Sequence, residues 1–260
     1  MSTPMSEGPD ELIMAVTDLV RDIVANVFGA LDDLRAATEA LIRSRQAAGT
    51  PLYREDLAGL LPAIEAVIQR TGGLAAGAGF VPVPGTLADE QQWLEWWLRG
   101  EQTRPLRRLV VDLDPSSDHY LDFTRLAWYD TPLRTGRRHI TGPYVDYLCT
   151  GEYSLTFTMP VTLPSGDSPG VYGVVGADVY VSDLEPRLLP HLARLAFPAS
   201  LVNAQRRVVM STSPMHTTGS LIRQVGPASP GAPSHRLATN VSGPLYQCGD
   251  SPLFLMAPSP

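Results

Sequence analysis

Apolar residues recur at three- and four-residue steps from Pro9 to about Arg45, a spacing typical of an amphipathic helix. Pro9 is followed by Asp10 and Glu11, and a first-turn proline followed by acids favours the start of a helix. The pattern therefore predicts one helix of about 35 residues, longer than one face of a domain requires. Its apolar positions are Leu12, Val16, Leu19, Ile23, Val27, Leu34 and Leu41.

Shorter elements are predicted between residues 50 and 113. Thr50-Pro51 resembles a helix cap followed by a first-turn proline, so a second helix is expected to about Arg70, broken or kinked at Pro62. We interpret three tryptophans as a core plug on a helix rather than a binding platform. The expected elements downstream are a turn at 72–79, a strand at 80–83, the helix at 87–98 with Trp93, Trp96 and Trp97, and a strand at 106–113.

Two segments alternate between apolar and polar residues and predict a β-hairpin. The first is 154–159 and the second is 171–181, and the residues 164–170 between them are typical of a turn. On the second strand, Asp178 shares a face with Gly176. A carboxylate at a sheet centre is costly without a partner, which is either an internal arginine or backbone N–H groups, or the ammonium group of a ligand.

The remaining chain predicts a helix at 183–196, a hairpin of strands at 199–203 and 207–211, a loop-rich part at 214–235, and short strands near Leu237 and at 245–248. Helices come first and hairpin-linked strands follow, which indicates an α+β fold with a central antiparallel sheet and flanking helices. We expect an N-terminal helical region at residues 1–76 and a sheet domain at 77–260.

Composition narrows the function. The chain has 260 residues and a net charge of −7, which argues against a direct nucleic-acid surface. No apolar run approaches ~18 residues, so we expect no membrane span. The acidic N-terminus lacks a basic segment, so we expect no secretory signal and a cytoplasmic location. All 20 basic residues are arginine, which excludes lysine-dependent Schiff-base and phosphate-loop chemistry.

Catalytic and metal sites find little support in the sequence. His139, Asp146 and Cys149 could form a Cys/His/Asp group, but their spacing matches no nucleophile motif, so we expect no enzyme. The five histidines are scattered, and no metal site or cofactor is expected. Cys149 and Cys248 are expected to be reduced thiols.

An ordered set of motifs resembles the Cache (PAS-like) sensor domains of bacterial receptors. These are D-x(5)-W-Y ending at Tyr129, T-G-P-Y-x-D ending at Asp146, T-x-T-x-P-V at 156–161, and G-V-x-G-x-D ending at Asp178. The resemblance covers about residues 77–214. It implies a long N-terminal helix packed on an antiparallel sheet, with a ligand pocket beneath loops between the middle strands.

The resemblance also implies roles for individual residues. Trp128 and Tyr129 would hold the carboxylate or polar head of a ligand, whereas Tyr144, Asp146 and Asp178 would contact its amine. Carboxylates and aromatic faces both suit an ammonium group. The predicted ligand-binding residues are Trp128, Tyr129, Tyr144, Asp146, Asp178, Tyr120 and Thr156.

Two departures from the family shape the expected function. Leu126 stands where amino-acid-sensing members carry an arginine, and Arg125 would point the other way if the segment is extended. Ligands without a carboxylate are therefore favoured. Alternatively, Arg134, Arg137 or Arg138 binds the carboxylate of the ligand. The second departure is location, because most family members lie outside the membrane between spanning helices, whereas this chain is expected to have none and to be cytosolic. We also expect no output domain, and therefore a non-enzymatic sensor of an amine, amino acid or small organic acid that acts on a separate partner, such as a transcriptional regulator. The alternative is an accessory interaction module with the same fold and no ligand. In either case the long helix could form a homodimer.

Overall fold

The computed structural model describes residues 8–100, 106–147, 151–165, 168–222 and 244–257. Its contacts divide the chain into two compact units. One, here called the pocket unit, comprises residues 25–141 and 146–180. The other, here called the second unit, comprises residues 1–24, 142–145 and 181–260. The sequence-based boundary at residue 76 stays a prediction.

The N-terminal helix is confirmed as one continuous element, α1 (Pro9–Ala47). The buried face of α1 differs from the predicted one. Apolar residues line two adjacent faces of the helix, and only one of these faces is fully buried. Leu12, Leu19, Ile23 and Leu41 are half-buried at its edge. The buried row is Ile13, Val16, Val20, Val24, Val27, Leu31, Leu34, Thr38 and Ile42. No helix in the described ranges has the length and apolarity to cross a bilayer.

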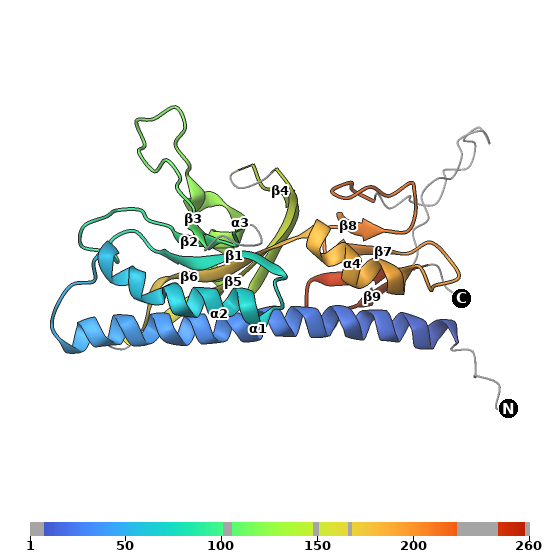
Figure 1. Ribbon diagram of the computed structural model, residues 1–260, viewed down its shortest axis with the longest axis horizontal. Coiled ribbons are helices and arrows are strands. Elements are labelled where there is room, and N and C mark those ends of the chain that lie inside the picture. The colour runs from blue at the N-terminus through green and yellow to red at the C-terminus, as the bar shows by residue number, and fades with distance from the viewer. Residues whose placement is uncertain (1–7, 101–105, 148–150, 166–167, 223–243, 258–260) are drawn as a thin grey trace. The chain divides into compact units, whose positions relative to one another are not determined.

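The second predicted helix is two helices, η1 (Arg54–Leu60) and α2 (Leu61–Arg70), so the expected break at Pro62 is confirmed. Pro62 lies in the first turn of α2, where a missing backbone N–H costs nothing. In the pocket unit, α2 and the C-terminal part of α1 lie along one face of the sheet (Figure 1). Phe28 of α1 packs edge-on against Phe157, with ring centroids 5.3 Å apart.

A six-stranded sheet has the order β3-β2-β1-β6-β5-β4. The predicted hairpin is confirmed as β5 and β6, which pair antiparallel with Thr156 opposite Asp178 and Thr158 opposite Gly176. Strand β6 also pairs antiparallel with β1, where Gly77 lies opposite Asp178. The strands are β1 (Ala75–Pro82), β2 (Glu95–Leu98), β3 (Arg107–Arg108), β4 (His139–Val145), β5 (Tyr153–Ser165) and β6 (Ser168–Tyr180).

Three predictions around this sheet are wrong. The tryptophan-rich segment is the strand β2 and not a helix, because its aromatic residues suit a pleated surface and pair with β1. The glycine-rich turn at 72–79 mostly belongs to β1, where small residues allow close packing. The strand expected at 106–113 shrinks to β3 at the sheet edge.

Glycines on β1 and β6 make room for the side chain of Trp96. A Cβ added to Gly77 would lie 3.0 Å from Nε1 of Trp96, and one added to Gly176 would lie 3.0 Å from its Cη2. The indole therefore rests over two neighbouring strands with no side chain beneath it. We call Gly77 and Gly176 the glycine seat of Trp96.

The pocket-side face of the sheet is covered by η2 (Phe123–Arg125) and α3 (Ala127–Thr135). The segment around Trp128 is thus helical, with Leu126 as its N-terminal cap. Phe123 stacks on Trp128 at 6.1 Å between centroids and meets Tyr129 edge-on at 5.1 Å. This aromatic packing anchors α3 against the sheet and fixes the orientation of Trp128.

The second unit contains α4 (Val181–Leu192) and a four-stranded sheet of order β8-β7-β10-β9. The predicted hairpin is confirmed as β7 (Ser200–Asn203) and β8 (Val208–Ser211). The strand expected at 245–248 is β9 (Leu245–Gln247), and β10 (Leu253–Met256) was not predicted. The strand expected near Leu237 lies outside the described residues.

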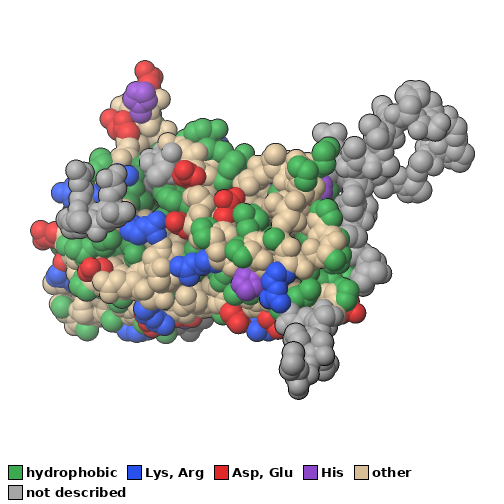
Figure 2. All heavy atoms as spheres, turned by 45° about the vertical axis from the view of Figure 1, so that its right-hand side comes forward, with side chains coloured by type: hydrophobic (Ala, Val, Ile, Leu, Met, Phe, Trp, Pro, Cys, Tyr) green, Lys and Arg blue, Asp and Glu red, His purple; other side chains and the backbone are tan. Residues whose placement is uncertain are grey.

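The two cysteines differ in what the structure records. Cys248 is a free, buried thiol, and burial raises its pKa to about 12, so it stays protonated. Cys149 lies outside the described ranges. On the face shown in Figure 2, acidic and basic side chains are interspersed rather than gathered into a basic patch.

The close approach of β1 and β2 predicts the response to Gly79→Ala. An added Cβ would meet the carbonyl oxygen of Glu95 and lie 2.7 Å from the Cα of Trp96, so the strand itself must move. We expect destabilisation of about 3 kcal/mol in urea unfolding, since overpacking against backbone is poorly relieved.

Gly29→Ala is the matched control for that substitution. Gly29 lies inside α1, and nothing lies within 4 Å of an added Cβ, so the alanine should stabilise the protein by about 0.5–1 kcal/mol. Equal effects of the two substitutions would contradict the proposed packing of β1 on β2.

Candidate functional site

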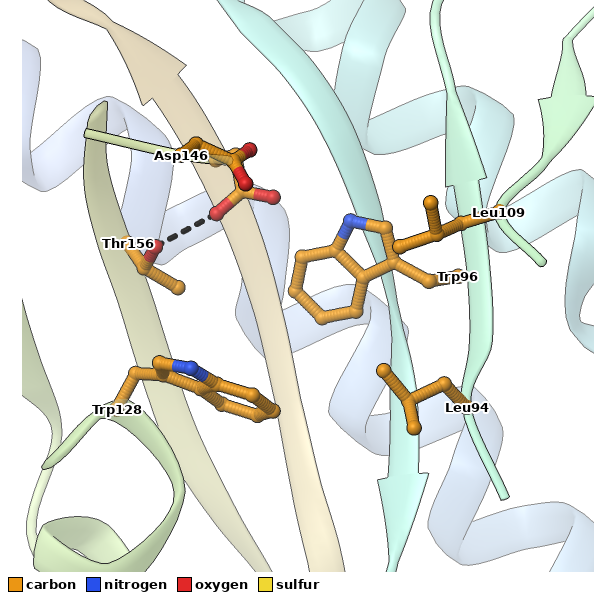
Figure 3. A pocket seen from close by; sticks show the side chains of 7 residues that line it. Leu94, Trp96, Leu109, Trp128, Asp146 and Thr156 are labelled. Atoms are coloured by element: carbon orange, nitrogen blue, oxygen red, sulfur yellow. Dashed lines mark hydrogen bonds between the residues drawn. The ribbon is translucent and has the colours of Figure 1, made fainter. Parts of the chain in front are cut away.

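A cavity of about 340 Å³, counted out to its open mouth, lies on the pocket-side face of the sheet. Its walls come from segments far apart in the sequence, because β2, β5, β6, α3 and the loops after β3 and β4 meet there (Figure 3). The part of this volume that the centre of a water molecule can occupy is about 40 Å³. The lining residues are Leu94, Trp96, Leu109, Trp128, Asp146, Thr156 and Asp178.

Asp178 provides a buried carboxylate at the centre of the sheet. Only 6% of the residue is exposed, and the hydroxyl of Thr156 donates a hydrogen bond of 2.6 Å to its Oδ1. Burial, together with the nearby charge of Asp146, raises the pKa of Asp178 to about 7. The hydrogen bond from Thr156 and the indole of Trp96 act in the opposite direction on this pKa. Asp178 is therefore poised to change its charge near neutral pH.

Asp146 brings a second carboxylate to the same cavity. It immediately follows β4, and it is 5% exposed. Two backbone hydrogen bonds hold it in place: its N–H donates to the carbonyl of Glu152 at 2.8 Å, and its carbonyl accepts from the N–H of Gly151 at 2.7 Å. Asp146 and Asp178 both line the cavity, and the charge of Asp146 acts on the pKa of Asp178. Two adjacent carboxylates favour a bound cation.

The sequence did not identify three of the lining residues, Leu94, Leu109 and Trp96, of which Trp96 carries a polar group. Trp96 is 4% exposed, and Figure 3 shows the nitrogen edge of its indole turned toward the carboxylates. The indole N–H lowers the pKa of Asp178, yet it makes no hydrogen bond of ordinary geometry within the described part of the chain. Because β2 was expected to be a helix, the alternation that directs Trp96 into the cavity could not be anticipated.

The structure brings together four of the predicted ligand-binding residues: Trp128, Asp146, Thr156 and Asp178. The other three are not among the lining residues. Tyr129 is buried behind Trp128 and donates from its hydroxyl to the carbonyl of Pro82 at 3.2 Å, and burial raises its pKa. Tyr120 donates to Oε1 of Gln92 at 3.1 Å, and Tyr144 is half-buried on β4. Ligand binding by all seven stays a prediction.

The arginines considered as carboxylate partners lie elsewhere. Arg134 pairs with Asp130 on α3, with Nε and Oδ2 3.5 Å apart. Arg138 lies over the ring of Phe28, 4.9 Å from its centroid, and Arg125 is exposed beside Asp122. None of the described residues that line the cavity is cationic. The site thus presents acceptors, two indoles and apolar walls.

The metal and enzyme alternatives gain nothing from the described residues. No group of three histidine, cysteine or carboxylate side chains in the described ranges is arranged to hold a metal ion. Burial lowers the pKa of His139, while Cys149 lies outside the described ranges, so the proposed Cys/His/Asp group is not assembled by any observed contact.

Solved structures with a similar fold are sensor domains. A periplasmic sensory domain of a Campylobacter jejuni chemoreceptor aligns with a TM-score of 0.57 and 12% identity, covering 81% of this chain and 73% of that one. A methyl-accepting chemotaxis protein X aligns at 0.54 and 15% identity, covering 95% and 97%. A Pseudomonas aeruginosa amino acid chemoreceptor domain in complex with L-arginine aligns at 0.50 and 17% identity, covering 82% and 73%. The chain has the α+β fold of Cache-type sensor domains.

Sequence comparison adds one short match. No protein-family model matches the chain. A citrate (Re)-synthase of Syntrophus aciditrophicus (strain SB) is 34% identical over 74 residues. That match covers 28% of this chain and 11% of the synthase, so it carries no functional assignment.

Asp178 predicts a pH dependence of stability. Folding raises its pKa from 3.8 to about 7, so its favourable contribution is complete below about pH 4 and is lost as the pH rises through 7. Asp178→Asn removes this loss, so between pH 5 and pH 8 it should lose less stability than the wild type, by about 3 kcal/mol at most. Urea unfolding at both pH values measures the effect.

Asp118→Asn, on an exposed loop, serves as the control and should leave the pH profile of stability unchanged. If wild type and Asp178→Asn show parallel pH profiles, Asp178 is not the buried acid described above.

Proposed function

We propose that this chain is the ligand-binding domain of a sensor and takes a small molecule with an ammonium group into the cavity. The observation that carries the proposal is the convergence of Asp146 and Asp178, both more than nine-tenths buried, in the lining of one pocket. Two carboxylates in one pocket offer charge-assisted hydrogen bonds to a bound cation.

The walls of the cavity suit the remainder of such a ligand. The indoles of Trp96 and Trp128 contact each other in the lining, with centroids 6.4 Å apart and planes tilted at 50°. Their faces attract a cation, and Leu94 and Leu109 offer apolar surface for a carbon skeleton. The ligand is therefore an amine with an apolar body.

Among the classes considered, an amine fits better than an amino acid, and a small organic acid fits least. A free carboxylate would lie near two acids, and no cationic residue lines the described part of the cavity. An amino acid could still bind if its carboxylate projects through the open mouth into water.

The output of the sensor is proposed from the sequence. We propose a separate partner protein, such as a transcriptional regulator, a homodimer through α1, and a cytoplasmic location, as the sequence suggested. The similar domains named above are described as periplasmic or as parts of chemoreceptors, so localisation needs its own measurement, by fractionation of the native host.

The second candidate is an accessory interaction module that binds no ligand. The apolar stripe of α1 is buried within the chain itself, so its outward face is mainly charged. A dimer through that face would rest on ion pairs, which are weak when exposed to solvent. Gel filtration of full-length protein at low and high salt distinguishes a charge-mediated dimer from a monomer.

A ligand screen tests the sensor directly. Aliphatic and aromatic amines, followed by amino acids, should raise the melting temperature of the purified protein, because binding to the folded state stabilises it. Asp178→Asn and Asp146→Asn should each weaken binding by at least tenfold, since each removes a charge-assisted contact. The exposed control Asp118→Asn should bind as the wild type does.

The sensor proposal fails if no amine or amino acid in the screen moves the melting temperature. It also fails if Asp178→Asn binds as tightly as the wild type, because the cation would then be held elsewhere. Isothermal titration calorimetry with the best amine gives the affinities for this comparison.

Affinity for an amine should depend on pH through Asp178. The charged carboxylate population rises about tenfold between pH 6 and 8 around a pKa of about 7, while an alkylammonium stays protonated. We therefore expect about tenfold tighter binding at pH 8 than at pH 6, and a flatter profile in Asp178→Asn. Weaker binding at pH 8 would contradict the role of this carboxylate.

A further inference from the structure

The cavity combines a hydrogen-bond donor with two acceptors at the same end. The donor is the indole N–H of Trp96, and the acceptors are the carboxylates of Asp146 and Asp178 (Figure 3). All three side chains are more than nine-tenths buried. The described residues provide the indole N–H with no hydrogen bond of ordinary geometry.

The position of this donor is fixed by the sheet. The glycine seat lies under the indole, with Gly77 beneath its nitrogen edge and Gly176 beneath its far edge. Gly77 is also the cross-strand partner of Asp178, so the same strand pairing sets the indole N–H beside that carboxylate. Rotation of the ring would carry it off a surface shaped for it, so the donor is preorganised.

An unpartnered buried donor needs an acceptor from a ligand. Leaving an N–H buried without a partner costs about 1–3 kcal/mol, which a ligand that supplies the acceptor recovers on binding. The acceptor must be neutral, because an anion would be repelled by two neighbouring acids. A hydroxyl satisfies both sides, since its oxygen accepts from the indole while its proton is donated to a carboxylate.

We propose that the pocket recognises an amino alcohol, in which the ammonium group binds between Asp146 and Asp178 and a nearby hydroxyl accepts the indole N–H of Trp96. This inference rests on the proposed amine-binding function and specifies its ligand class. Trp96 is then a specificity-determining residue that selects hydroxylated amines over their deoxy analogues.

The chemistry of the site ranks three matched probes. A plain amine pairs with the carboxylates but leaves the indole N–H without a partner. An amino acid supplies acceptors, but its carboxylate lies against like charge. An amino alcohol satisfies the donor and the acceptors together, and Leu94, Leu109 and Trp128 can enclose an aromatic or alkyl body.

The experiment compares 2-amino-1-phenylethanol, 2-phenylethylamine and L-phenylalanine by isothermal titration calorimetry at pH 8. All three share a phenyl ring and an amino group, and they differ in the hydroxyl or the carboxylate. For the wild type we expect 2-amino-1-phenylethanol to bind about tenfold tighter than 2-phenylethylamine, the gain of one buried hydrogen bond. L-phenylalanine should bind most weakly.

Trp96→Phe removes the N–H and keeps an aromatic ring over the glycine seat. It should bind the two amines with equal affinity, so the tenfold preference disappears. Trp97→Phe is the matched control: its indole N–H donates to Glu95 at 2.7 Å, outside the cavity, so the preference should be retained.

A third readout does not depend on any variant folding. Proton–nitrogen NMR of the wild type shows the indole N–H groups of its four tryptophans. Adding 2-amino-1-phenylethanol should shift one of these signals downfield as its N–H gains an acceptor, whereas 2-phenylethylamine should not produce that shift.

The outcomes separate this inference from the sensor proposal. Equal binding of both amines by the wild type overturns the role of Trp96 and leaves amine sensing intact. A preference that survives in Trp96→Phe overturns it as well. If none of the three probes binds, the inference fails, and the amine screen described above then decides whether the sensor proposal fails with it.

Discussion

The burial of two like charges next to each other is the constraint on which this structure depends. Asp146 directly follows β4 and Asp178 lies in β6, and each is almost fully buried. A folded protein tolerates such a pair if one member takes up a proton or if a cation joins them. Burial and the neighbouring acid account for a carboxyl whose pKa is about 7, so Asp178 changes its charge near neutral pH.

The glycine seat links this charge pair to the core of the pocket unit. Residues without side chains on β1 and β6 let one indole lie flat across the sheet, and β2 approaches β1 closely enough that Gly79 also tolerates no side chain. The polar end of the cavity therefore lies where β1, β2 and β6 pack closely at their glycines, while α3 packs on the opposite side through aromatic contacts. Specificity and stability depend on the same few positions.

The sequence predicted the elements with a clear period. The long helix and the β5–β6 hairpin follow from apolar spacing and strand alternation, whereas the register that places Asp178 opposite Thr156 was not predicted. The acids of the site were identified because charged residues among apolar neighbours demand a partner.

The failures have a common physical cause. Glycine and tryptophan carry weak local preferences, so the segments around Gly77 and Trp96 take their conformation from packing between strands that are distant in sequence. Tyr129 was assigned to the ligand through the family resemblance, but its hydroxyl on helix α3 donates to the carbonyl of Pro82. The orientation of a side chain on a short helix depends on the surface it meets.

The distribution of indoles has a practical consequence. Trp96 and Trp128 form walls of the cavity, whereas Trp93 and Trp97 donate their N–H groups to the buried carboxylate of Glu95 outside it. Intrinsic emission from this protein therefore combines two chromophores exposed to whatever enters the cavity with two in a constant environment. Tryptophan fluorescence of the unlabelled protein can therefore follow the occupancy of the cavity, with Trp93 and Trp97 as the internal reference.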